Sequence, residues 1–155
     1  MQKNRKKGIR ILGLFLAVFS IAMSHKFCFA YQIIQITDNE YLDDYPAISD
    51  GQIVWLGNHT NITADRDVFL FKNGHVVRLT NDIDYFKNDF ACAIHEGMVT
   101  WQRDAREIDL FDGTETKVLI SSPNHVNEMS PTIFDGKVAW LHWDILGGKP
   151  IQIYY

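Results

Sequence analysis

The first 30 residues contain no acidic side chain and no apolar run long enough to cross a bilayer. Five basic residues precede an apolar stretch of thirteen residues, 11–23, whereas a membrane-spanning helix needs about 20. A basic start, a short apolar centre and small residues at Cys28 and Ala30 are typical of a secretory signal peptide. The sequence therefore predicts a signal peptide over residues 1–30, cleavage before Tyr31, and an exported protein that is periplasmic, secreted or at the cell surface. An uncleaved membrane anchor is the alternative.

After that cleavage the chain has one cysteine, Cys92, and lacks the common catalytic motifs. One thiol cannot form an internal disulfide or a thiolate zinc cluster, so we expect Cys92 to be a small buried apolar residue, with pairing between molecules as the alternative. The histidines show no paired spacing for a metal, and no serine is framed by glycines as a nucleophile. The sequence thus predicts a protein that is not an enzyme and has no cofactor.

Basic side chains are scarce in residues 31–155, which carry nine of them against nineteen acidic ones, a formal net charge of −10. A protein of this sign repels phosphate backbones and anionic lipid surfaces. We therefore expect no nucleic-acid partner and no membrane partner after signal cleavage.

The remaining residues form an internal repeat that is marked by a glycine four residues before a tryptophan. The pairs are Gly51 and Trp55, Gly97 and Trp101, and Gly136 and Trp140. The glycines are 46 and 39 residues apart, which is near the period of four-stranded propeller blades. Isoleucine lies three residues before each glycine, and an acidic residue lies one before it. The tryptophans occupy equivalent positions, so we expect them to pack one blade on the next, with sugar stacking as the alternative.

Each copy has the pattern of four short strands, which predicts an all-β fold of three four-stranded antiparallel β-propeller blades at about 45–80, 91–120 and 130–155. The expected strands are 45–49, 52–57, 67–72 and 75–80, then 92–95, 98–103, 107–111 and 115–120, then 132–134, 137–143 and 150–155. Asp-Gly and Asn-Gly pairs between them are tight hairpin signals.

The third copy lacks a last strand, and residues 31–37 resemble the last strand of the first copy. This predicts that an N-terminal strand over 31–37 completes the last blade, as in closed propellers. Closed propellers have four to eight blades, so three are too few for one ring. Either two chains pair as a homodimer to form a six-bladed ring, or the chain is a truncated piece of a longer gene.

The segments Pro46 to Gly51, Val54-Trp55 and Leu79 to Asn81 resemble the TolB-like β-propeller repeats of exported bacterial proteins. The resemblance covers essentially all of 31–155, although the second copy has Cys92 where the other two have proline. It implies a periplasmic or cell-surface scaffold that binds proteins or glycans. A fold does not carry a ligand with it, so the resemblance identifies none.

Acidic residues before each copy are the candidate ligand-binding residues, together with one tryptophan at the exit of a strand. They are Asp43, Asp44, Asp89, Glu128 and Trp143. Loops that converge at one end of a propeller could form a ring of carboxylates that binds calcium or a basic partner, although solvated turn residues are the alternative. Our leading hypothesis is a non-enzymatic module that binds a protein or glycan at the bacterial envelope. The rival is a propeller hydrolase or lyase with its site in the central channel loops.

Overall fold

The computed structural model describes residues 32–58, 66–81 and 88–155, so the predicted signal peptide lies outside the described residues. Contacts divide the chain into a unit of residues 1–35 and a unit of residues 36–155, and the second unit contains all the strands. The described residues form an all-β structure without a helix. The described residues therefore contain no helix that could cross a membrane.

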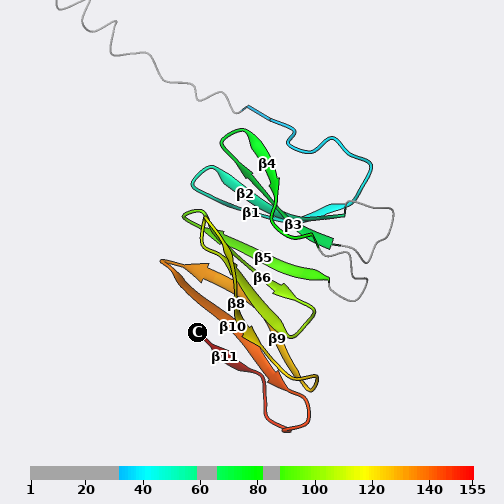
Figure 1. Cartoon of the computed structure of the whole chain (residues 1–155), viewed down its shortest axis with the longest axis vertical. Coiled ribbons are helices and arrows are strands. Elements are labelled where there is room, and N and C mark those ends of the chain that lie inside the picture. Colours follow the sequence, from blue (N-terminus) through cyan, green and yellow to red (C-terminus); the bar gives the residue numbers. More distant parts are fainter. Residues whose placement is uncertain (1–31, 59–65, 82–87) are drawn as a thin grey trace, which may run out of the picture. The chain divides into compact units, whose positions relative to one another are not determined.

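The strands form three antiparallel sheets that follow one another along the chain (Figure 1). The first sheet is β1 (Asp43–Ser49), β2 (Gln52–Asn58), β3 (Arg66–Lys72) and β4 (His75–Arg78). The second is β5 (Asp89–His95), β6 (Met98–Arg103), β7 (Glu107–Phe111) and β8 (Thr116–Ser121). The third is β9 (Val126–Phe134), β10 (Lys137–Asp144) and β11 (Gln152–Tyr154). In each sheet, strands that are neighbours in sequence pair with one another.

The glycines that mark the repeat lie in tight hairpins, as the sequence predicts. Asp50 and Gly51 both have positive φ angles, 50° and 72°, and the same holds for the two residues of the equivalent turns before β6 and β10. Two consecutive residues with positive φ match the right-handed twist of the flanking strands. This turn therefore fixes the register of the first hairpin of each sheet.

The first strand of each sheet contains a bulge at the same repeat position. Tyr45, Ala91 and Ser130 each lie six residues before the marker glycine and have positive φ angles of 53°, 41° and 50°. The pairing register of each first hairpin shifts at this point. A bulge lets the strand continue past a residue that makes no regular pair. The first strand of each sheet therefore begins before the bulge. The proline or cysteine after the bulge had suggested a later start.

The sheets pack face to face in the order first, second, third. Cross-strand partners lie on one face of a sheet, so each sheet has an indole face, which carries Trp55, Trp101 or Trp140, and a reverse face. Trp101 is fully buried against the reverse face of the first sheet, among Val54 and Leu56. Trp140 packs likewise against the reverse face of the second sheet, beside Ile108. Both internal interfaces thus join an indole face to a reverse face, and this confirms the packing role expected for Trp101 and Trp140.

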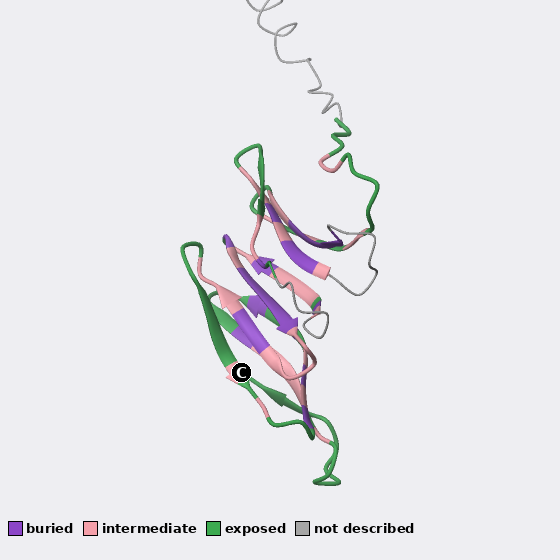
Figure 2. Ribbon diagram, turned by 45° about the vertical axis from the view of Figure 1, so that its right-hand side comes forward, coloured by how far each residue is buried: buried purple, intermediate pink, exposed green. Residues whose placement is uncertain are grey.

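The predicted N-terminal strand over 31–37 does not form in its described part, residues 32–37, and there the prediction is wrong. Residues 32–37 belong to no strand, and the third sheet has three strands. The edge that a fourth strand would join is β11, which makes only three residue pairs with β10. So short an edge offers few ladder hydrogen bonds to order another strand. Figure 2 shows that β11 is exposed along its length.

Candidate functional site

Three of the predicted site residues occupy one repeat position inside the sheets. Asp43, Asp89 and Glu128 each lie eight residues before the marker glycine, in β1, β5 and β9. The sequence predicts them in loops, but the bulge extends the strand through them. Asp89 and Glu128 are buried, so they face other parts of the protein and do not line an open loop.

The cross-strand partner of this acid is the residue two positions after the tryptophan. It is Gly57 opposite Asp43, Arg103 opposite Asp89, and His142 opposite Glu128. The acid, the indole and this third residue form a repeated cluster whose chemistry differs from sheet to sheet. The sequence contains the signal for it, because all three positions keep constant offsets from the glycine.

In the first sheet the cluster is a hydrogen-bonded acid beside two cavities. The indole Nε1 of Trp55 donates to Asp43 Oδ1 at 3.0 Å, and Asn39 Nδ2 donates to Asp43 Oδ2 at 3.0 Å. Cavities of about 170 and 240 Å³ share Asp43 and Trp55 in their walls. A Cβ atom at Gly57 would lie 2.6 Å from Asp43 Oδ1 and 3.1 Å from the Phe69 ring. Only glycine fits there, so the backbone of β2 approaches the carboxylate closely.

Asp44 next to it turns to a different partner. Its Oδ2 lies 2.9 Å from Arg66 Nη2, in a half-buried ion pair. The guanidinium of Arg66 also lies over the ring of Tyr45, 5.8 Å from its centroid. Asp44 therefore joins β1 to β3, and its carboxylate is occupied by a cation of the same sheet.

In the third sheet the acid is Glu128, which is held by three side chains. Trp140 Nε1 donates to Oε2 at 2.7 Å and Ser122 Oγ donates to Oε1 at 2.7 Å. His142 Nδ1 lies 2.8 Å from Oε1, and its ring packs 4.4 Å from the Tyr154 ring. A carboxylate bound to one nitrogen of an imidazole fixes the orientation of the ring. The spacing of His142 from the other histidines gives no indication of this contact with Glu128.

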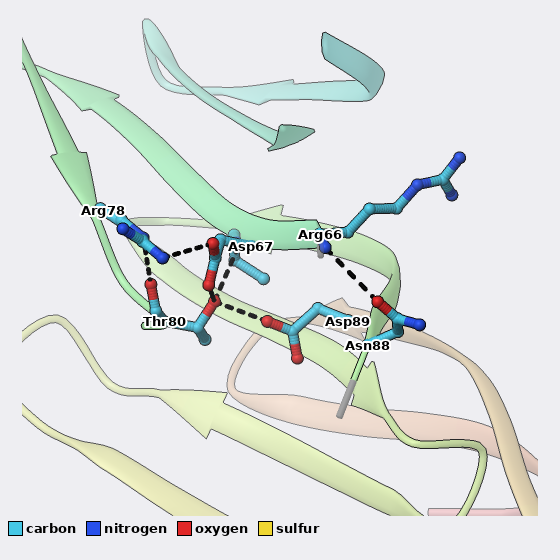
Figure 3. A network of polar contacts seen from close by, with 7 residues as sticks. Arg66, Asp67, Arg78, Thr80, Asn88 and Asp89 are labelled. Atoms are coloured by element: carbon cyan, nitrogen blue, oxygen red, sulfur yellow. Dashed lines mark hydrogen bonds and ion pairs between the residues drawn. The ribbon is translucent and has the colours of Figure 1, made fainter. Parts of the chain in front are cut away.

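In the second sheet the acid belongs to a network that ties this sheet to the first (Figure 3). The Thr80 hydroxyl lies 2.5 Å from Asp89 Oδ2 and 3.1 Å from Asp67 Oδ1, and both carboxylates are fully buried. Arg78 Nη2 binds Asp67 Oδ2 at 2.6 Å. The same hydroxyl accepts from the backbone N–H of Val68 at 2.9 Å. Thr80, which follows β4, thus links β3 to β5.

Arg103 supplies the positive charge on the other side of Asp89. Its Nε lies 3.7 Å from Asp89 Oδ1 and its Nη1 lies 3.1 Å from Asp109 Oδ2. Asp109 is also fully buried. Buried carboxylates need charged or hydrogen-bonding partners to offset the loss of water, and this arginine provides them. With Asp89 engaged in this way, Trp101 Nε1 has no hydrogen-bond partner among the described residues.

Trp143 is the one predicted site residue that lies at the surface. With Ile145 and Leu146 it forms what we call the β10–β11 tip, in which all three side chains are exposed. Asp144 Oδ1 accepts from Gly147 N at 2.8 Å, and Ile145 N donates to His125 O at 2.9 Å. These bonds hold the tip in one conformation although its apolar side chains face water.

No group of three or more metal-ligating side chains is present among residues 32–58, 66–81 and 88–155. No family model, curated protein or solved structure matches this chain. The class that its own geometry defines is an all-β repeat protein of three antiparallel sheets, in which successive sheets pack indole face to reverse face.

Cys92 is partly buried and packs on the core between the first two sheets, which agrees with the apolar packing role that the sequence predicts. Burial raises the pKa of the Cys92 thiol to about 12. At pH 8 such a thiol is ionised in roughly one molecule in ten thousand, and the thiolate is the reactive form. We expect Ellman's reagent to react with Cys92 in the folded protein about a hundredfold more slowly than with Cys92 in urea. Equal rates in the two conditions would show that Cys92 is accessible and ionised.

Proposed function

We propose that the three sheets are blades of a β-propeller of the TolB-like kind, and that the protein is a non-enzymatic module exported to the bacterial envelope. The blade assignment is supported by the neighbour-to-neighbour strand order of each sheet and by the repeated packing of an indole face on a reverse face. The export assignment is supported by the signal-like pattern of residues 1–30.

The function of this module is to bind a partner, which is a protein or a glycan, and the β10–β11 tip favours a protein. The observation that carries this proposal is the exposure of Trp143, Ile145 and Leu146 on a turn that internal hydrogen bonds hold in place. Clustered apolar side chains with aromatic residues are typical of protein interfaces. The acids at Asp89 and Glu128 are engaged inside the protein, so the binding surface is apolar and not a ring of carboxylates.

Cosedimentation with envelope fragments of the producing bacterium tests this function. We expect the purified protein to sediment with the fragments, and the substitution Leu146→Asp to lower the bound fraction about tenfold, because it places a charge at the centre of the apolar contact. Leu146 is 79% exposed, so the variant keeps its fold. Protease treatment of the fragments should abolish binding, whereas digestion of their glycans should leave it intact.

Val118→Asp is the matched control, because Val118 is also an exposed apolar residue but lies in β8. It should bind as the unmodified protein does. Equal losses in the two variants, or no sedimentation with any envelope fraction, would contradict the proposal. Loss of binding after glycan digestion alone would identify a glycan as the partner.

A further inference from the structure

Two sheet faces are uncovered by any other sheet within the described residues, and they are of opposite kinds. The first sheet packs its reverse face on the second sheet, so no described sheet covers its indole face, although residues 36–39 line cavities against it and Trp55 is only 5% exposed. The third sheet packs its indole face on the second sheet, which leaves its reverse face open. The first and third sheets therefore present the two kinds of surface that the internal interfaces bring together.

One exposed residue of the open indole face, Ile48, has buried counterparts in the other two sheets. The isoleucine three positions before the marker glycine is Ile48, Ile94 or Ile133. Ile94 and Ile133 are only 8% and 6% exposed, because each lies in an internal interface, but Ile48 is 70% exposed. An exposed isoleucine at a position that is buried in the other two sheets indicates an interaction surface.

The open reverse face shows the same contrast. The residues that pair with the position after the tryptophan are Val68, Ile108 and Ile153, opposite Leu56, Gln102 and Leu141. Val68 and Ile108 are 0% exposed in the two internal interfaces, whereas Ile153 is 78% exposed. Each open face thus carries an apolar side chain whose equivalents are buried.

Charge is also complementary between the two open faces. Asp43 lines both cavities beside Trp55 on the indole face. Lys137 lines a cavity of about 260 Å³ on the third sheet, together with Phe134 and Tyr155. An acidic group on one face and a lysine on the other favour their association and disfavour pairing of either face with itself.

We infer that a second copy of this chain docks head to tail, with the open indole face of each copy on the open reverse face of the other. Contacts between two different faces make a ring when the rotation closes, and two chains supply six sheets, within the four to eight of closed propellers. The closure of the ring rests on the proposed blade arrangement. The docking of the two faces rests on the internal interfaces themselves.

Sedimentation equilibrium of the full chain, expressed with its own N-terminal segment, tests this assembly. We expect the mass of two chains, and a mass halved in both Ile48→Glu and Ile153→Glu, because each variant places a charge in both interfaces of the ring. Lys137→Glu, at an exposed position of the reverse face, should also shift the equilibrium toward the monomer. Circular dichroism should show unchanged strand content, since all three positions are exposed.

Mixing the two isoleucine variants distinguishes head-to-tail docking from other modes. A mixed pair retains one unmodified interface, in which Ile48 of one copy meets Ile153 of the other, so the mass of two chains should return. A monomeric unmodified protein, a mass that grows with concentration beyond two chains, or dissociation by only one of the two variants would overturn the inference. Leu146→Asp is the control, because it should lower envelope binding about tenfold without changing the mass, so a failure of either proposal is recognised separately.

Discussion

Replacing Trp101 by alanine should lower the free energy of unfolding by about 4 kcal/mol, the range for a large aromatic residue removed from a core. Trp101 is fully buried between the first two sheets, where it packs against Val54 and Leu56. Its removal leaves a cavity that two rigid sheets cannot close. Urea denaturation followed by circular dichroism measures the change.

Trp143→Ala is the matched control for this prediction, because it removes the same side chain from the exposed β10–β11 tip. It should change the free energy of unfolding by less than about 1 kcal/mol, as surface substitutions do. Similar losses in both variants would mean that Trp101 does not carry the packing of the first sheet on the second. Trp101→Phe should lose less than the alanine variant, since it keeps most of the apolar volume and removes an indole N–H that has no partner among the described residues.

Replacing Asp89 by alanine should lower the free energy of unfolding by about 3 kcal/mol, the range for removing one member of a buried charged network. The carboxylate lies between the Thr80 hydroxyl and the Arg103 guanidinium in a fully buried position, so its removal takes a partner from both groups. The loss should act on the joint between the first and second sheets. Relative to the unmodified protein, the amide exchange rates of the variant should therefore rise more in β3 and β5 than in β10.

Glu115→Ala provides the comparison, because it removes a carboxylate from an exposed pair with Lys117, whose charged atoms are 3.0 Å apart. Exposed pairs contribute about 0–1 kcal/mol, so this variant should unfold almost as the unmodified protein does. If the two variants lost equal stability, the buried network would be incidental to the joint between the sheets. The contrast isolates burial, because both substitutions delete a single acidic side chain.

Local patterns of the sequence predicted the hairpins well, because turn chemistry acts over two residues. Asp50-Gly51 and Asn73-Gly74 adopt the positive φ angles that their residue types favour, and the strands on either side follow from apolar alternation. The starts of β1, β5 and β9 were predicted too late. The bulges at Tyr45, Ala91 and Ser130 hide the continuation of each strand, since none of these residues is a glycine that would signal a positive φ.

The candidate site was predicted in its residues but not in its chemistry. Asp43, Asp89 and Glu128 were singled out as acids, but whether they are solvated or buried depends on the bulge and on cross-strand pairing. The pairing of Glu128 with His142 joins residues fourteen positions apart on neighbouring strands. Both residues lie at constant distances in sequence from the marker glycines. That regularity predicts the contact only once the strand register is known.

The repeated joining of unlike faces also bears on how such a chain can change its length. Each sheet presents one face of either kind, so a duplicated or deleted repeat leaves the same two terminal surfaces as before. A gene of this kind can therefore gain or lose whole units without creating a new type of surface.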